Sequence, residues 1–290
     1  MQQLKGTGVA LVTPFNSKYE VDYQGLTRLV KHVSDGGVDY LVVLGTTGES
    51  VTLTKDEKKK ILEHVLSVNA NKLPVVLGIG GNNTQEILET ISHTDFSGIS
   101  AILSVSPYYN KPIQEGIYQH YIKIADACPV PVILYNVPGR TSSNMLPETT
   151  LRLAQHNNII AIKEASGSVE QVMKIIKNKP DNFMVISGDD ALTLPFMAVG
   201  AVGVISVVAN CHPKPFSEMV NYCLNTDFIS AQKIHYKLLD VIDLLFVEGN
   251  PGGVKAALKA LGIIEDYLRL PLVNVSETTY KKIDALVKKI

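Results

Sequence analysis

The sequence contains no tryptophan, and aromatic residues make up only 7% and charged residues only 19% of its 290 residues. A typical soluble domain has about 25% charged residues. The 27 basic and 28 acidic residues nearly cancel, which leaves no basic excess to hold a phosphate backbone. The scarcity of aromatic rings also argues against a stacking surface for single-stranded nucleic acid. We therefore expect no nucleic-acid partner, and a hydrophobic fraction of 46% rules out intrinsic disorder.

Sequence motifs for disulfides, metals and nucleotides are also missing. The three cysteines are an odd number and have no C-x-x-C spacing, so we expect them to be reduced. The first 15 residues lack the apolar run of a signal peptide, so we expect a cytoplasmic protein. The seven histidines include no H-x-x-x-H or H-E-x-x-H pair, and no G-x-x-x-x-G-K-[ST] loop is present. Residues 78–83 begin like a dinucleotide-binding loop, but Asn83 replaces its last glycine. We expect neither a metal nor an organic cofactor.

One stretch, residues 191–212, contains no acidic residue, lysine or arginine and is long enough to span a bilayer. Pro195, Gly200 and Gly203 interrupt it. Buried parallel strands are continuous apolar runs, because helices cover both of their faces. We therefore predict a helix over 191–199 and a buried strand over 203–207, with no membrane association.

Short apolar runs bounded by Gly, Pro, Asn or Asp recur along the chain, and amphipathic segments lie between them. The runs cover residues 8–12, 40–44, 75–79, 101–105, 132–135, 159–163, 184–187 and 203–207. Parallel strands need helical crossovers, and eight such units close a barrel of about 250 residues. We predict an α/β fold, a (β/α)8 TIM barrel; the alternative is an open doubly wound sheet with a small second domain.

The C-terminal part of the sequence has a different pattern. After about residue 225 three helical stripes follow one another, within 234–245, 254–261 and 280–287, with no strand between them. We predict a barrel domain over 1–225 and a C-terminal helical domain over 226–290. Helix starts are predicted from cap spacing at Thr54, Asn83 and Ser168, and from the proline at Pro147.

In such a barrel, functional residues gather where the strands end. Lys163 follows an uncharged apolar run, so its amine would lie in the barrel mouth. Desolvation favours the neutral, nucleophilic form of an amine, which can form a Schiff base with a carbonyl substrate. Tyr135, on the neighbouring strand, and Thr46 offer hydroxyls for proton transfer. The alternatives are a lysine that extends to water and a tyrosine that caps the core.

Two loops could bind carboxylates. Residues 45–49, Gly-Thr-Thr-Gly-Glu, place hydroxyls and backbone N–H groups before a helix, although an ordinary turn would also use these glycines. Arg140 follows Pro138 and Gly139 in a loop, where its guanidinium could bind a second carboxylate in bidentate fashion. A surface arginine in a turn is the alternative.

These motifs occur together, in order, in one family. Residues 8–15, 45–49, 106–112, 135–141 and 162–167 resemble the dihydrodipicolinate synthase and N-acetylneuraminate lyase family of class I, Schiff-base aldolases. The resemblance covers essentially the whole chain. Val-Pro-Gly-Arg-Thr at 137–141 is most similar to the branch that condenses pyruvate with L-aspartate 4-semialdehyde on the diaminopimelate route to lysine. Another pyruvate aldolase, acting on sialic acid or keto-sugar acids, is the alternative, and a metabolite-binding barrel without catalysis is a third hypothesis.

The resemblance also implies roles for individual residues. Lys163 would form the imine with pyruvate, and Thr46 and Thr47 would bind its carboxylate. Tyr135, Thr46 and Tyr109 would form the proton relay, with Tyr109 supplied by the neighbouring subunit. Arg140 would bind the semialdehyde, and Gly188 and Ile205 would line the site. The implied assembly is a homotetramer, built as a dimer of dimers.

The family's lysine-feedback site lies at a subunit interface. The matching positions here are Ser50, Val51, Leu53, Lys55, Lys58, Asn82, Glu86 and Tyr108. In feedback-sensitive members, position 58 is typically His or Glu and position 55 is often His. A lysine at either position repels the incoming ammonium group, so we predict weak or absent inhibition by lysine.

Overall fold

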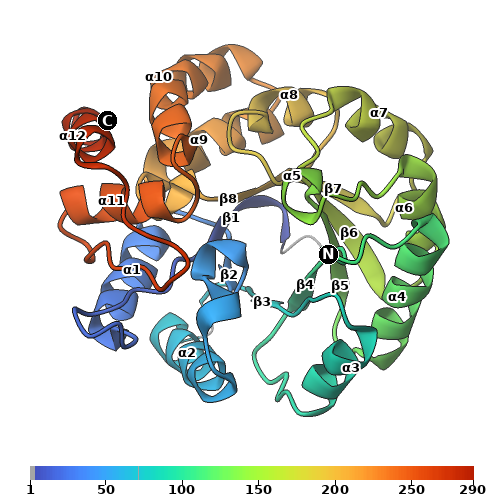
Figure 1. Cartoon of the computed structure of the whole chain (residues 1–290). Helices are drawn as coiled ribbons and strands as arrows, with labels where there is room; N and C mark the ends of the chain where they lie inside the picture. Colours follow the sequence, from blue (N-terminus) through green and yellow to red (C-terminus); the bar gives the residue numbers. More distant parts are fainter. Residues whose placement is uncertain (1–3, 71) are drawn as a thin grey trace.

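The computed structural model describes residues 4–70 and 72–290 and contains a closed barrel of eight parallel strands in chain order (Figure 1). The predicted barrel is thus confirmed. The strands are β1 (Gly6–Ala10), β2 (Tyr40–Val43), β3 (Val75–Gly78), β4 (Ala101–Val105), β5 (Val132–Asn136), β6 (Ile159–Glu164), β7 (Met184–Ser187) and β8 (Gly203–Ser206).

The first strand differs from its prediction. It was expected over 8–12 but covers Gly6–Ala10, because Gly6 pairs with Gly203 of β8 at its beginning. At its other end the amide of Val12 donates to the Asn210 side chain instead of to a strand. Local hydrophobicity does not show either contact.

Helices surround the barrel, one after each strand. They are α1 (Tyr23–Asp35), α2 (Lys55–Asn69), α3 (Thr84–Ser92), α4 (Gln114–Ala127), α6 (Pro147–Leu153), α7 (Val169–Asn178), α8 (Thr193–Ala198) and α9 (Pro213–Leu224). Short turns of helix also follow the strands: η2 (Thr46–Gly48), η3 (Ser50–Thr52), α5 (Pro138–Thr141) and η4 (Val208–Asn210).

The predicted helix starts are confirmed. Thr54 forms a complete capping box with Glu57, and the Ser168 side chain accepts from the amide of Gln171. Pro147 is the first residue of α6. Asn83 caps α3, but its side chain accepts from the amide of Gln85 rather than from the third helical residue.

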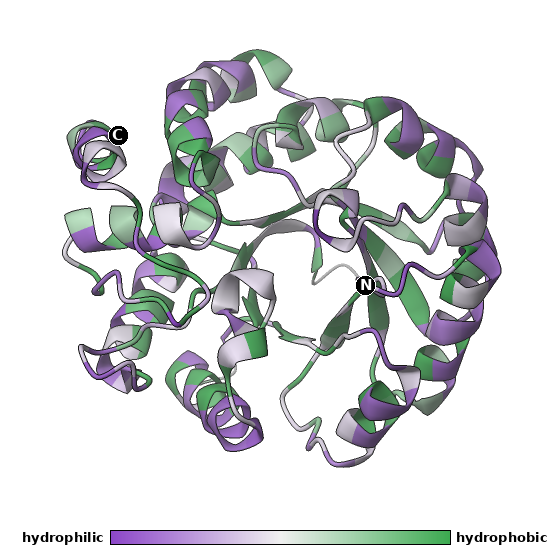
Figure 2. Ribbon diagram, in the orientation of Figure 1, coloured by the Kyte–Doolittle hydropathy of each residue, from purple (hydrophilic) through white to green (hydrophobic). Residues whose placement is uncertain are grey.

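The strands separate two apolar layers, so they are buried on both faces. In β2, Tyr40 and Val42 point into the barrel, while Leu41 and Val43 pack against the helices. Figure 2 shows apolar residues concentrated on the strands and alternating with hydrophilic ones along the surrounding helices. The uncharged stretch 191–212 contains α8 and β8, as predicted. None of the helices described for residues 4–70 and 72–290 is both long and apolar enough to cross a membrane.

Three helices form the C-terminal extension: α10 (Phe228–Phe246), α11 (Gly252–Ala260) and α12 (Glu277–Val287). α10 and α12 contain the first and third predicted stripes, and α11 contains the second except for Leu261, which directly follows the helix. The boundary predicted at 225/226 falls between α9 and α10, but α10 packs against α8 and α9. The apolar residues of the extension therefore belong to the same hydrophobic cluster as the helical shell of the barrel.

Candidate active site

Lys163 and Tyr135 lie side by side at the carboxyl ends of β6 and β5. They are partners in the strand register, and the Lys163 Nζ lies 4.3 Å from the centroid of the Tyr135 ring. Both residues are only 6% exposed. Tyr135 belongs to the apolar cluster inside the barrel, as does Ile205 of β8. A primary amine is thus held at the barrel mouth, against an aromatic ring that ends in a hydroxyl.

Gly188, directly after β7, leaves room for the Lys163 side chain. A Cβ added at this position would lie 3.0 Å from both Cγ and Cε of Lys163 and 2.8 Å from Cβ of Ala165. These contacts are closer than ordinary packing allows. The absence of a side chain at 188 therefore leaves the space that the Lys163 side chain occupies.

The residue after Lys163 points to the other side of the strand, where it anchors the end of β6. Glu164 is fully buried and accepts from the side chains of Asn136 and Gln171 and from the amide of Ser166 at 2.8 Å. Burial raises the pKa of Glu164, and these hydrogen bonds oppose the rise. Glu164 was not among the predicted site residues, although a charge at the end of an apolar run is a visible signal.

The loop after β2 is held from several directions. Thr47 is buried, and its hydroxyl accepts from the side chain of Asn250, at 3.0 Å. The Gly48 carbonyl accepts from the Thr13 hydroxyl at 2.7 Å. Thr46 is exposed at the rim of the barrel. One threonine of the pair is thus fixed by the protein, and the other presents its side chain to solvent.

Arg140 lies in a short helical turn, α5, and not in the loop that we predicted. Pro138 is at the first position of this turn and presets the helical backbone angle. The Arg140 side chain is exposed, and its Nη2 donates to the backbone carbonyl of Asn250 at 3.3 Å. Asn250 therefore contacts both Thr47 and Arg140, a role that the sequence analysis did not assign to it.

Tyr109 lies on the loop after β4, away from the barrel interior. It is 88% exposed and has a left-handed backbone conformation, with φ of 73°. The loop is fixed by two asparagines, because Asn82 donates to the Tyr108 carbonyl and Asn110 donates to the Asn82 carbonyl. Within one chain, Tyr109 is thus a projecting aromatic side chain on an ordered loop.

The positions matched to the feedback site come from neighbouring elements. Ser50 and Val51 are in η3, Lys55 and Lys58 are in the first turns of α2, and Val51 is 81% exposed. Leu53 is buried, Glu86 is exposed on α3, and the side chain of Asn82 contacts Tyr108. Partial burial lowers the pKa of Lys58, and the charge of Lys55 lowers it further.

Asp190 is a second buried carboxylate near the ends of the last strands. Its Oδ2 accepts from the amides of Val207 and Val208, at 3.0 and 3.2 Å. Burial raises the pKa of Asp190 to about 6, against the opposing effect of these hydrogen bonds.

Among residues 4–70 and 72–290, no group of three or more His, Cys, Asp or Glu side chains could hold a metal ion.

Comparison with known proteins identifies the family. The model of the dihydrodipicolinate synthetase family matches residues 3–290. The 4-hydroxy-tetrahydrodipicolinate synthases of Flavobacterium psychrophilum and Parabacteroides distasonis are 55% and 54% identical, over 100% and 99% of this chain and 99% and 97% of their own. A crystal structure of the chloride-inhibited dihydrodipicolinate synthase from Acinetobacter baumannii, complexed with pyruvate, has a TM-score of 0.96 and 38% identity over 98% of each chain. The chain belongs to the dihydrodipicolinate synthetase family.

Proposed function

We propose that this protein is a 4-hydroxy-tetrahydrodipicolinate synthase, which condenses pyruvate with L-aspartate 4-semialdehyde through a Schiff base on Lys163. The observation that carries the proposal is the buried Lys163 amine beside Tyr135 at the mouth of the barrel. The match to the relative from F. psychrophilum, which is named for this activity, covers the whole chain. The structural neighbour from A. baumannii was solved with pyruvate.

The geometry supports the following chemistry. The Lys163 amine attacks the ketone of pyruvate, and loss of water gives an imine. The protonated imine withdraws electrons, so the pyruvate methyl group loses a proton. The imine thereby becomes an enamine, whose nucleophilic carbon is the former methyl carbon. The enamine carbon adds to the aldehyde of the semialdehyde, whose oxygen takes up a proton. The amine of the semialdehyde then displaces Lys163 and closes the ring. A relay of Tyr135, Thr46 and Tyr109 would move these protons.

The two substrate carboxylates need separate partners. We assign the pyruvate carboxylate to Thr46 and Thr47, in the loop after β2. We assign the semialdehyde carboxylate to Arg140, whose exposed guanidinium lies near this loop through their common contact, Asn250. Gly188 and Ile205 complete the wall around Lys163.

We further propose a homotetramer in which Tyr109 enters the site of a neighbouring subunit. Its support is the 88% exposure of this aromatic side chain on a loop that hydrogen bonds hold in place. An exposed tyrosine with a fixed backbone can complete a second subunit's relay at little cost in conformational entropy.

The direct test traps the imine. The protein is incubated with pyruvate and borohydride, and the adduct is located by peptide mass. We expect a label on Lys163, none in Lys163→Ala, and an unchanged label in the control Lys177→Ala on the exposed end of α7. A wild-type protein without any label would refute the proposed chemistry.

Steady-state kinetics test the second substrate. Arg140→Ala should raise the KM for aspartate semialdehyde by about 10- to 100-fold, because a charged hydrogen-bond donor to a carboxylate contributes about 1.5–3 kcal/mol. The KM for pyruvate should change little. Arg152→Ala, which removes an exposed ion pair with Glu115, is the matched control. Faster turnover of N-acetylneuraminate than of the semialdehyde would favour the alternative aldolase.

A further inference from the structure

A buried ion pair connects the C-terminal extension to the loop after β2. Lys255 of α11 contacts the carboxylate of Glu49, the last residue of the Gly-Thr-Thr-Gly-Glu loop, and both side chains are completely buried. The Lys255 amine also donates to the Tyr267 carbonyl at 2.8 Å and lies 4.2 Å from the centroid of the Phe15 ring. Residues that are 206 positions apart are thus joined at the end of the loop that carries Thr46 and Thr47.

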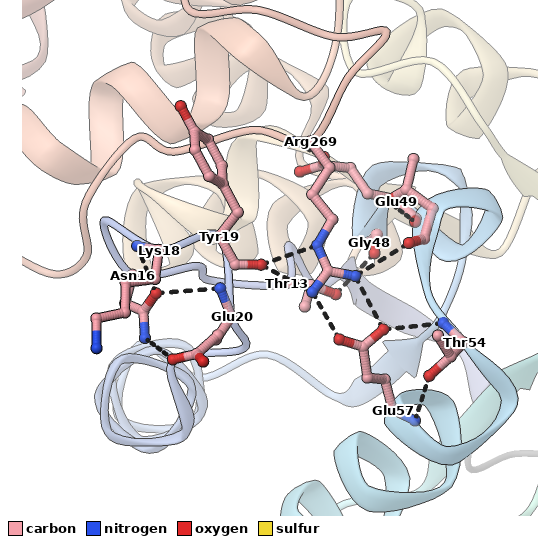
Figure 3. A network of polar contacts seen from close by, with 11 residues as sticks. Thr13, Asn16, Lys18, Tyr19, Glu20, Gly48, Glu49, Thr54, Glu57 and Arg269 are labelled. Carbon is pink, nitrogen blue, oxygen red and sulfur yellow. Dashed lines mark hydrogen bonds and ion pairs between the residues drawn. The ribbon is translucent and has the colours of Figure 1, made fainter.

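Arg269 provides a second link to the same carboxylate. Its backbone amide donates to Oε2 of Glu49 at 3.1 Å. Its guanidinium donates to Glu57, at 2.6 and 2.8 Å, and to the carbonyls of Tyr19 and Thr52 (Figure 3). Glu57 also caps α2, so the extension holds both ends of the segment that follows the loop.

The backbone of this loop needs such support. Leu44 and Glu49, which flank its four other residues, both have left-handed conformations, with φ of 60° and 52°. Residues other than glycine rarely adopt these angles, which cost on the order of 1 kcal/mol each. The loop also lies directly on β3, where a Cβ at Gly78 would be 2.3 Å from the Leu44 carbonyl oxygen. Its conformation is therefore imposed by its surroundings.

We propose that Lys255 is a positioning residue, which holds the loop in the conformation that presents Thr46 and Thr47 to the pyruvate carboxylate. This inference rests on the function proposed above. Stability alone is a weak explanation for a pair in this environment, because well-packed apolar replacements of buried ion pairs are often neutral or stabilising. A pair that ties a strained loop to a distant helix instead selects one loop geometry.

The proposal is tested with one single and one double variant. Lys255→Met leaves the Glu49 charge buried without its cation, so it should lower the thermal midpoint as well as pyruvate binding. Glu49→Gln combined with Lys255→Met removes both charges and should restore most of the thermal midpoint. Lys259→Met, one turn further along α11, removes an ion pair with Asp266 that does not touch the loop, and is the matched control.

The readout is the pyruvate concentration that gives half-maximal labelling by borohydride, together with the KM values of both substrates. In the double variant we expect the half-maximal pyruvate concentration and the pyruvate KM to rise about tenfold, equivalent to about one lost hydrogen bond to the carboxylate. The KM for aspartate semialdehyde should rise less than the pyruvate KM, because Arg140 lies on α5 and contacts the loop only indirectly, through Asn250.

Three outcomes separate the possibilities. A double variant with restored thermal midpoint but weakened pyruvate binding supports the positioning role. A double variant that regains both would show that the pair acts only on stability, and would overturn the inference while leaving the proposed function intact. A wild-type protein that forms no pyruvate adduct would overturn the proposed function and this inference with it.

Discussion

Substitution of Gly188 by alanine tests whether the path of the Lys163 side chain determines reactivity. The new Cβ would lie 3.0 Å from Cγ and Cε of Lys163 and 2.8 Å from Cβ of Ala165. Ala165 follows a strand fixed by the buried Glu164, so we expect the flexible lysine to yield instead. Overpacking of this kind costs about 1–3 kcal/mol.

The displacement should affect the reaction more than the fold. A shift of about 1 Å in a reacting group can cost about 100-fold in rate, so Gly188→Ala should form the pyruvate adduct at least about tenfold more slowly. Its thermal midpoint should fall by about 2–4 °C for each kcal/mol lost. The assay follows borohydride trapping at saturating pyruvate, in parallel with thermal unfolding.

The matched control is Gly81→Ala. A Cβ at position 81 would lie 3.7 Å from Cγ1 of Ile87, which is an ordinary packing distance. This variant should trap pyruvate at the wild-type rate. If Gly188→Ala also reacted at the wild-type rate, the side chain of Lys163 would have room that the structure does not show, and the steric reasoning would be wrong.

Two further predictions concern pH and regulation. Burial raises the pKa of Asp190 to about 6 in the folded protein, above about 3.9 in the unfolded chain, so the folded state keeps a proton that the unfolded state has released. The contribution of this group to the free energy of unfolding therefore falls as pH rises from about 4 to about 6, by up to about 3 kcal/mol. Asp190→Asn should remove that decline when unfolding is measured at pH 4 and at pH 6.5. A stability difference between wild type and variant that does not change with pH would contradict this. Millimolar L-lysine should leave the wild-type rate within about twofold of its uninhibited value. Lys58→Glu should create inhibition, because a carboxylate attracts the ammonium group that Lys55 and Lys58 repel. Inhibition of the wild type by micromolar lysine would refute this charge argument.

The barrel was predictable because its strands are local features of the sequence. Each apolar run is buried on two faces, and turn residues bound it, so seven of the strands lie within one residue of the predicted runs at both ends, and β1 is shifted by two residues. The adjacency of Lys163 and Tyr135 followed from the same pattern, since each residue ends a predicted run and the two strands are consecutive. The bounds of β1 differ from the predicted run because contacts with Gly203 and Asn210 determine its ends.

The support behind the site was not predictable in the same way. Lys255 lies between apolar residues of α11, and nothing in that helix indicates that its amine is completely buried. Its partner, Glu49, lies 206 positions away in the sequence. Arg269, the other residue that binds this carboxylate, is 220 positions from Glu49. Helical periodicity identifies which face of α11 is apolar, but it does not identify a partner across the fold. Only the folded chain brings these residues together.

Three buried carboxylates show a common use in this charge-poor protein, whereas a fourth, Asp266, forms an ion pair with Lys259. Glu164 is the last residue of β6, Asp190 follows β7 by three residues, and Glu49 ends the loop after β2. They accept from the backbone amides of Ser166, of Val207 and Val208, and of Arg269, respectively. Hydrogen bonds to a charged acceptor are stronger than those between neutral groups, and they fix the backbone that provides the donor.

A barrel mouth built from loops has many amides that no strand can pair, and an unpaired buried amide costs free energy. Glu164 satisfies one such amide and Asp190 satisfies two, and Glu49 satisfies an amide of the C-terminal extension. In two of the three cases a reactive position of the proposed mechanism is next to the carboxylate or within three residues of it: Lys163 beside Glu164, and Thr46 and Thr47 before Glu49. In the proposed mechanism, Glu49 and Glu164 therefore fix the backbone next to reacting groups, and of these groups Lys163 and Tyr135 are buried at the barrel mouth.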